Sequence, residues 1–141
     1  WILKIAADYP GKIQYIGEIP HSQVLQMSAD ADLLFVLRDQ KLPVNRFICG
    51  SKILEAMMCG TPILVGGGTS TAKMVQEEQC GLIVNEKNVQ EIRAAVVTLM
   101  QDKMLRENIS KNARRAFETK YCWRIMEKKL LMFYSDLLMN R

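Results

Sequence analysis

The chain has 141 residues, a length that suits one domain with a sizeable hydrophobic core. Hydrophobic residues make up 49% of it and charged residues 24%, a balance that is typical of folded proteins and excludes a disordered chain. The formal net charge of +4 is not gathered into one block, and no basic-aromatic pattern accompanies it, so nucleic acid is not an expected partner.

The four cysteines form no Cys-x-x-Cys pair, and the single histidine, His21, lies far from them in the sequence. This pattern predicts no metal site and favours a reducing, cytoplasmic compartment. No signal peptide is visible, and no apolar run approaches the roughly 20 residues of a membrane-spanning helix. Because the chain begins at Trp1, without a Met and within a helical pattern, we expect a fragment of a longer protein.

Two helices and two strands are predicted at the start of the chain. Apolar residues at helical spacing predict a helix over Trp1–Asp8, and the short stretch Lys12–Gly17 is typical of a strand. Ser22 is expected to cap a helix over Gln23–Ala29. Leu33–Leu37 is an uninterrupted apolar run, which predicts a strand buried on both faces, as in a parallel sheet covered by helices.

The middle of the chain has the clearest pattern. A helix is predicted over Gly50–Cys59, with Gly60 in left-handed backbone just beyond its end. A buried strand, Ile63–Val65, follows, and Gly66–Gly68 then allows the backbone to turn or to approach a ligand closely. The N-terminus of the helix carries partial positive charge, and Glu55 lies one turn in, which indicates a site for an anion or a sugar.

The second half of the chain is mostly helical. A helix over Thr69–Gln79 leads to a short strand, Leu82–Val84. Asn88 and Glu91 are expected to form a capping box for the next helix, and Asp102 to cap the helix after it. The last two helices are predicted over Lys103–Lys120 and Trp123–Leu138, and three of their aromatic residues are expected to pack in the core or between helices: Phe117, Trp123 and Phe133.

Strands that alternate with helices predict an α/β fold: a Rossmann-like parallel sheet flanked by helices, with further helices at the C-terminal end. In such sheets ligands bind beyond the carboxyl ends of the strands. Three loops follow strand ends and are expected to meet at one rim, near the helix Gly50–Cys59: Gly17–His21, Arg38–Asn45 and Gly66–Ser70. His21 itself is interpreted as a turn residue without a catalytic role.

Five short motifs occur in a fixed order, namely Tyr15–Gly17, Ala29–Leu33, Gly50–Pro62 (GSKILEAMMCGTP), Gly67-Gly68 and Gly81–Val84. With this order and spacing, nearly the whole chain resembles the C-terminal, nucleotide-sugar-binding half of GT-B glycosyltransferases, most closely family 4. The resemblance implies that residues 1–141 are one donor-binding domain of a two-domain hexosyltransferase. Such an enzyme transfers a sugar from a nucleotide donor to a glycan, lipid or other acceptor, without a metal and with retention at the anomeric carbon.

The resemblance also assigns residues to the donor. A glutamate at the position of Glu55 hydrogen-bonds the ribose hydroxyls, and a glycine at that of Gly50 lets backbone N–H groups approach the sugar and diphosphate. Lys52 and Arg38 are expected near phosphate, with a solvated surface position as the alternative for each. The full set of expected donor-binding residues is Arg38, Gly50, Ser51, Lys52, Glu55, Gly67, Gly68 and Thr69.

One position departs from the family pattern. The family often has a second glutamate, eight positions before the ribose-binding one and near the donor sugar, and here that position is Phe47. Either a neighbour such as Asp39 takes its place, or the chain belongs to a branch without that carboxylate. Catalytic residues therefore stay unassigned, and the expected small molecule is the substrate itself, a UDP- or GDP-sugar, with no further cofactor.

The expected partners are the nucleotide-sugar and an N-terminal, acceptor-binding domain of the same protein. The isolated fragment would bind donor weakly and turn nothing over. A lipid acceptor would bring a peripheral association with the cytoplasmic face of a membrane. One alternative is a flavodoxin-like regulatory domain, which is disfavoured because Arg38 and glycines occupy the strand ends where an acidic cluster would be needed. The other alternative is an epimerase or phosphorylase of the same architecture.

Overall fold

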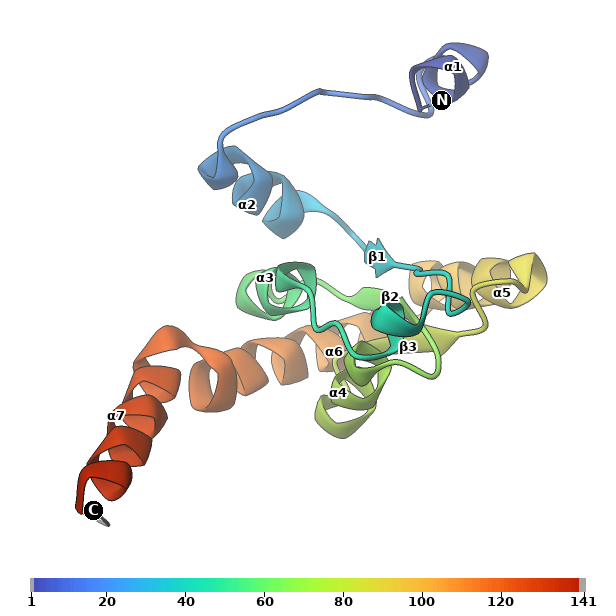
Figure 1. The fold of residues 1–141 in the computed structure, drawn as a ribbon. Helices are drawn as coiled ribbons and strands as arrows, with labels where there is room; N and C mark the ends of the chain where they lie inside the picture. Colours follow the sequence, from blue (N-terminus) through green and yellow to red (C-terminus); the bar gives the residue numbers. More distant parts are fainter. Residues whose placement is uncertain (1, 140–141) are drawn as a thin grey trace.

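The computed structural model describes residues 2–139, with helices packed around a small parallel sheet (Figure 1). Within these residues the sheet has three strands, β1 (Leu34–Val36), β2 (Ile63–Gly66) and β3 (Gly81–Val84). Their order is β1-β2-β3, and both neighbouring pairs are parallel. The predicted α/β class with a parallel sheet is confirmed.

The helices are α1 (Ile2–Asp8), α2 (His21–Asp30), α3 (Ser51–Cys59), α4 (Ser70–Glu78), α5 (Val89–Gln101), α6 (Lys103–Ala116) and α7 (Trp123–Met139). A short 3-10 turn, η1 (Pro43–Arg46), lies in the loop after β1, and a π-helical turn, η2 (Phe117–Tyr121), joins α6 to α7. Helices and strands alternate from α2 to α5, and the chain ends in helices, as the sequence predicts.

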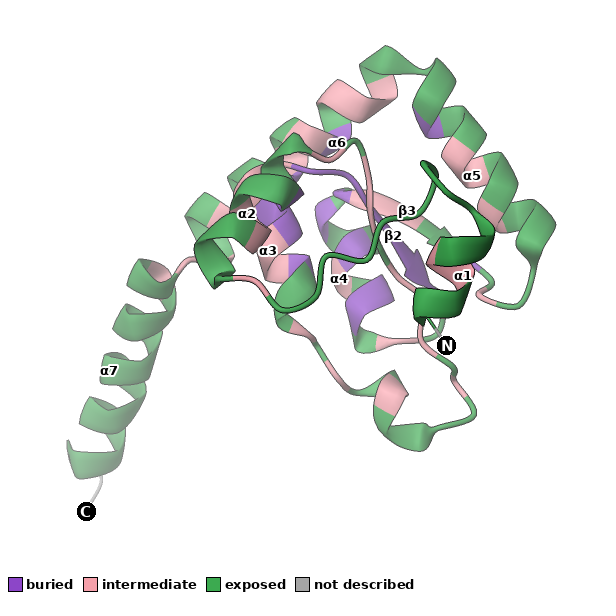
Figure 2. Ribbon diagram, turned by 90° about the horizontal axis from the view of Figure 1, so that it is seen from above, coloured by how far each residue is buried: buried purple, intermediate pink, exposed green. Residues whose placement is uncertain are grey.

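The hydrophobic core lies on one face of the sheet, between β2 and the helices α3, α4 and α6 (Figure 2). Ile63 and Val65 of β2 are fully buried, and Ile53 and Met57 of α3 pack against them on the predicted apolar face. Cys80 is also fully buried, and burial raises the pKa of its thiol to about 11. This thiol therefore stays protonated and unreactive at neutral pH.

β1 is an edge strand with only one covered face, so the expected burial of Leu33–Leu37 on both faces is wrong. Leu34 and Val36 pack against the core, whereas Phe35 is 69% exposed. In the sheet Phe35 lies beside Leu64, which is buried on that second face. The helix on this second face of the sheet is α5, and it packs against β3 at the opposite edge. Phe35 is therefore left exposed to solvent.

Residues 12–17 form an extended connection between α1 and α2, so the predicted strand Lys12–Gly17 is wrong (Figure 1). Ile13, Tyr15 and Ile16 are exposed along it. A strand needs neighbouring backbone to bond its N–H and C=O groups, and in the described part of the chain this segment has no strand beside it. Trp1, the predicted start of the preceding helix, lies outside the described residues.

Most helix ends agree with the predicted caps. Gly60 follows α3 in left-handed backbone, at φ 71°. Asp102 caps α6 by accepting a backbone N–H of the first turn at 2.8 Å. Asn88 caps α5 in the same way, at 3.2 Å. The capping box is incomplete, however, because the Glu91 carboxylate accepts the N–H of Asn85, at 3.0 Å, and not that of Asn88.

The helix α2 starts earlier than predicted. Pro20 stands directly before the helix in extended backbone, and its carbonyl accepts the N–H groups of Gln23 and Val24, at 2.9 and 3.2 Å. His21 is therefore the first helical residue, and Ser22 lies inside the first turn without a capping bond. The predicted cap at Ser22 and the predicted turn position of His21 are both wrong.

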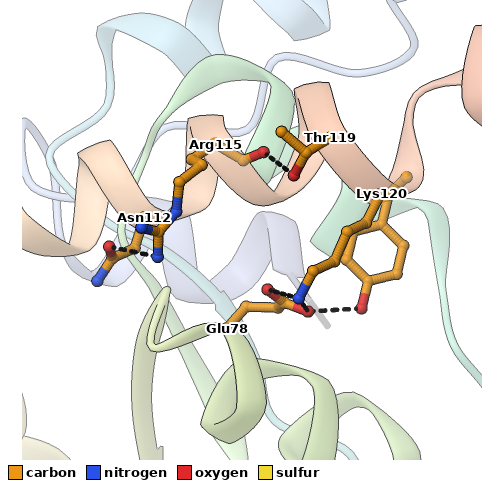
Figure 3. A network of polar contacts seen from close by, with 6 residues as sticks. Glu78, Asn112, Arg115, Thr119 and Lys120 are labelled. Atoms are coloured by element: carbon orange, nitrogen blue, oxygen red, sulfur yellow. Dashed lines mark hydrogen bonds and ion pairs between the residues drawn. The ribbon is translucent and has the colours of Figure 1, made fainter.

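The predicted helix Lys103–Lys120 is divided, because α6 passes into the π-helical turn η2. A polar contact holds this turn against α4 (Figure 3). The carboxylate of Glu78, buried at the end of α4, accepts from Lys120 Nζ with both oxygens at 2.8 Å and from the Tyr121 hydroxyl at 3.0 Å. The turn thus brings a cation and a hydroxyl onto one buried carboxylate.

The helix α7 extends away from the sheet (Figures 1 and 2). It packs against η2 and has no buried residue. Trp123 and Phe133 are exposed, so their expected packing in the core or between helices is wrong, whereas Phe117 packs against the core as predicted. The amphipathic sequence pattern correctly predicts this helix, but the helix has no buried residue on its apolar face.

The contact at Glu78 predicts an unusual tyrosine titration. Burial, the hydrogen bond to Glu78 and the charge of Glu78 together raise the pKa of Tyr121 to about 12, with burial the largest cause. Because the folded-state value lies above the unfolded value near 10, this contact stabilises the fold fully below pH 10 and is lost between pH 10 and 12. We expect Tyr121 to be the last of the four tyrosines to ionise in an ultraviolet absorbance titration.

Glu78→Gln should bring the titration of Tyr121 back toward that of the other tyrosines. Glu77→Gln is the matched control, since Glu77 lies next to Glu78 but is exposed and is a weaker cause of the shift. An equal change in the two variants would contradict the assignment to Glu78.

Candidate functional site

The loops that follow β1 and β2 meet at one rim of the sheet, as predicted, whereas the third predicted loop, Gly17–His21, follows no strand in the described part of the chain. The Ser70 hydroxyl at the start of α4 donates to the carbonyl of Arg46, at 3.1 Å, and the Thr71 hydroxyl donates to that of Ile48, also at 3.1 Å. Side chains at the start of α4 thus hold the loop that leads into α3. Hydrogen bonds therefore connect the loops at the carboxyl ends of the strands to one another.

Gln40 makes the main connection between these loops, and the sequence analysis did not identify it. Its amide Nε2 donates to the carbonyl of Gly67, after β2, and to Glu86 Oε2, after β3, at 3.0 Å. Gly68 is in left-handed backbone, at φ 67°, and a Cβ there would lie 2.8 Å from Gln40 Oε1. One side chain from the loop after β1 thus joins the loops after all three strands, a role that only the tertiary fold reveals.

The N-terminus of α3 gathers positive charge. Gly50 occupies the N-cap position in extended backbone, and its carbonyl accepts the N–H of Ile53 at 3.3 Å. Arg38 lies directly over this glycine, because a Cβ on Gly50 would be 3.0 Å from Arg38 Nη2. Ser51 and Lys52 follow on the exposed first turn. A guanidinium beside the positive end of a helix is an arrangement suited to an anion.

Glu55 lies one turn further along α3. Its side chain is 19% exposed, and its Oε1 is 3.2 Å from Nε2 of His21, which is 68% exposed. Glu55 and Lys52 line a pocket of about 260 Å³ between α2, β1 and α3, together with Leu34 and Phe35. The pocket combines an apolar wall with one carboxylate and one ammonium group, and this combination is typical of small-molecule sites.

The remaining predicted residues lie on the other side of the rim. Gly67 lines a second cavity, of about 570 Å³, with Lys41, Arg46 and Glu86. The Thr69 hydroxyl is already used in the fold, since it accepts the N–H of Ala72 at 3.0 Å to cap α4. The structure therefore brings Arg38, Gly50, Lys52 and Glu55 together around the start of α3, and places Gly67, Gly68 and Thr69 in the neighbouring loop.

The position of the family's second glutamate carries no carboxylate in this chain. Phe47 stands there and is exposed. Asp39, the predicted substitute, accepts the N–H of Lys41 at 3.0 Å within its own loop, and its carbonyl accepts from Asn45 at 2.7 Å. These contacts give Asp39 a role in shaping the loop, and its role toward a sugar stays a prediction.

Among residues 2–139, no group of three or more His, Cys, Asp or Glu side chains is placed to hold a metal ion. No helix in this range is both long enough and apolar enough to span a membrane. The four cysteines, all within this range, are free.

Residues 3–116 match the family described as glycosyl transferases group 1, and the chain belongs to this family. The fold and the family match therefore define a glycosyltransferase domain, and the family prediction made from the sequence motifs is confirmed. Neither the flavodoxin-like regulatory domain nor the epimerase or phosphorylase is supported.

Individual relatives agree with the family. The chain is 26% identical, over 92% of its length and 32% of the relative's, to an N,N'-diacetylbacillosaminyl-diphospho-undecaprenol alpha-1,3-N-acetylgalactosaminyltransferase of Campylobacter jejuni. It is 32% identical, over 88% of its length and 30% of the relative's, to a glycosyltransferase of Methanocaldococcus jannaschii. The chain thus spans about a third of the length of these relatives.

A solved structure shows the same fold. Sucrose-phosphate synthase from Thermosynechococcus elongatus superposes with a TM-score of 0.80, over 99% of this chain and 34% of that one. The sequence identity is only 19%, so the likeness concerns the fold alone.

Proposed function

We propose that this domain binds the nucleotide-sugar donor of a hexosyltransferase. The observation that carries the proposal is the position of Glu55, whose carboxylate faces a pocket one turn from the N-terminus of α3, at the carboxyl rim of the sheet. Ligands of open α/β sheets bind at this rim. Arg38 over Gly50 supplies the adjacent positive charge that a diphosphate requires.

The proposed role of Glu55 follows from its hydrogen-bonding capacity. An ionised carboxylate only accepts hydrogen bonds, and its two oxygens can take the two neighbouring hydroxyls of a ribose. A half-buried carboxylate makes these bonds in a medium of lower dielectric constant, where they are stronger than in water. The apolar wall formed by Leu34 and Phe35 suits the flat face of a nucleobase or of the ribose itself.

The diphosphate would lie across the start of α3. The free N–H groups of the first turn and the Arg38 guanidinium point to this place, with Lys52 beside it on the wall of the pocket. Gly67 and Gly68 would border the sugar-phosphate end, because Gln40 holds their loop next to the loop that carries Arg38. Thr69 would act there through its backbone, since its hydroxyl caps α4.

The complete enzyme, in this proposal, adds an N-terminal acceptor-binding domain to the donor-binding one. The length of the relatives, about three times that of this chain, supports a second domain. Closure of the two domains over the acceptor would exclude water and complete the site, so this domain alone would bind donor weakly and turn nothing over. We further propose a UDP- or GDP-sugar as donor, no metal, and retention at the anomeric carbon.

The acceptor and location follow the same reasoning. The C. jejuni relative is named for an acceptor carried on diphospho-undecaprenol, which supports a lipid-linked saccharide as the acceptor here. An enzyme with such an acceptor would work at the cytoplasmic face of a membrane without a span of its own in this domain.

Donor binding predicts a specific loss in Glu55→Gln. The neutral amide has one acceptor oxygen in place of two charged ones, and losing a hydrogen bond to a charged group costs about 1.5–3 kcal/mol, or roughly 10–100-fold in affinity. The measurement is an NMR titration of this chain with UDP, GDP and their sugar conjugates. We expect shifts centred on Gly50–Glu55 and Gly66–Ser70 for one nucleobase, and a much weaker affinity in the variant.

Glu107→Gln is the matched control. Glu107 is also a partly buried helical glutamate with an ion pair, 3.7 Å from Lys103, and its side chain is 44% exposed, but it lines a cavity beside Thr61 at the opposite end of β2. Its substitution should leave the titration unchanged. The proposal fails if no nucleotide shifts these signals at about 10 mM, a concentration at which even a dissociation constant of about 1 mM gives nearly full binding. It also fails if Glu55→Gln binds the nucleotide as tightly as Glu107→Gln and the original chain do.

A further inference from the structure

The helices α2 and α3 are joined by a row of side-chain contacts. Near their C-terminal ends the Thr61 hydroxyl donates to the carbonyl of Ser28, at 2.6 Å, and this contact is buried. One turn earlier, the Cys59 thiol donates to the carbonyl of Leu25, at 3.6 Å. The two helices are therefore held in a definite register. That register brings the first residue of α2 next to Glu55.

The third contact of the row is the one between His21 and Glu55, at 3.2 Å. An ionised carboxylate cannot donate, so Nε2 of His21 is the donor in this pair. Lys52 and Glu55 are the charged residues of α3 that line the pocket between the two helices, and Cys59 follows Glu55 on the same helix face. Burial and the charge of Glu55 raise the pKa of the Cys59 thiol, so Glu55 faces a neutral thiol on that side.

We infer that His21 is a positioning residue of the donor site, which orients the carboxylate of Glu55 toward the ribose. This inference rests on the proposed role of Glu55. The imidazole N–H occupies one lone pair of Oε1, and an ionised carboxylate offers about four such positions, so capacity remains for two ribose hydroxyls. A glutamate side chain has several rotamers, and fixing one of them before the ligand arrives lowers the entropic cost of binding.

His21 is suited to this role by its position in the fold. It is the first residue of α2 and is exposed, so a substitution removes the contact without disturbing the core. It is also the only histidine of the chain. The Thr61 and Cys59 contacts keep α2 in place when the His21 ring is removed.

The test measures the affinity for UDP and GDP in His21→Ala, His21→Gln and Glu55→Ala, and in the double variant His21→Ala/Glu55→Ala. We expect His21→Ala to weaken binding about fivefold, the usual size for one orienting hydrogen bond. His21→Gln retains an N–H donor and should restore most of the affinity. In the Glu55→Ala background, removal of His21 should have no further effect, because His21 acts through Glu55. Alanine is used there because a glutamine at position 55 would keep an oxygen that accepts from His21.

A second readout separates orientation from a merely structural role. The ¹³C resonance of the Glu55 carboxyl carbon should move in His21→Ala and return in His21→Gln, in the absence of nucleotide. The inference is overturned if this resonance does not move, or if His21→Ala weakens binding equally with and without Glu55. If Glu55→Ala binds like the original chain, the proposed function has failed; if it binds weakly and His21→Ala does not, only the inference has failed.

Discussion

Gly81→Ala is expected to lower the free energy of unfolding by about 3 kcal/mol, the upper end of the usual range for overpacking, because the added Cβ meets buried backbone that has no room to move. Gly81 begins β3 and lies beside Ile63 of the central strand β2. A Cβ at this position would be 2.0 Å from the carbonyl oxygen of Ile63 and 2.8 Å from its Cγ2. Urea unfolding followed by circular dichroism measures the effect, and the unfolded fraction in water should rise visibly.

The matched control for this prediction is Gly66→Ala, at the end of β2 in the same sheet. A Cβ on Gly66 would meet Glu86 Cβ at 3.5 Å, an ordinary van der Waals distance. We expect a change of less than about 1 kcal/mol there, as for a strand residue that gains a methyl group without a clash. A similar loss of stability in the two variants would show that the strands β2 and β3 are not packed in the described register.

Ile53→Ala is expected to lower the free energy of unfolding by about 2–5 kcal/mol, the range for removing a large buried side chain. Ile53 is 1% exposed and packs on β2 from the helix α3 that carries Lys52 and Glu55. The variant should therefore also lose nucleotide binding when it is partly unfolded, and regain it in conditions that restore the fold. Urea unfolding and the nucleotide titration measure the two effects.

Ile53→Val and Leu131→Ala are the controls. The valine variant removes one methylene and should cost about 0.5–1.5 kcal/mol. Leu131 lies on α7 and is 61% exposed, so its truncation should change the stability of the domain by less than about 0.5 kcal/mol. Equal losses for Ile53→Ala and Leu131→Ala would contradict this prediction and would mean that α7 packs in the core, whereas Figure 2 shows it exposed.

Local features of the sequence were enough to predict much of the fold. The helix α3, its end at Gly60 and the strand after Pro62 follow from apolar spacing and from the backbone preferences of glycine and proline, which act over a few residues. The candidate Glu55 was found by motif and helix position, both of which are also local. The family, too, was recognised from short motifs and their spacing, and the comparison confirms it.

Features that depend on distant partners could not be predicted in this way. Residues 12–17 have a strand-like composition but no neighbouring strand, and Trp123 has a core-like composition but no covering element in the described part of the chain. Gln40 joins the loop after β1 to Gly67, which is 27 positions away, by a hydrogen bond that no sequence pattern predicts. Composition indicates what a segment is able to form, while its partners decide whether it does.

The sequence by itself determined the α/β class, the order of the elements from α2 to α6, and the glycosyltransferase family, because these depend on local periodicity, caps and motif spacing. Only the tertiary structure decided the surroundings of the candidate site. The register of α2 against α3 places His21 beside Glu55, 34 positions apart, and the path of the connection between β1 and α3 places Arg38 over Gly50. The physical reason is that such contacts arise from the packing of whole elements, so no single segment specifies them.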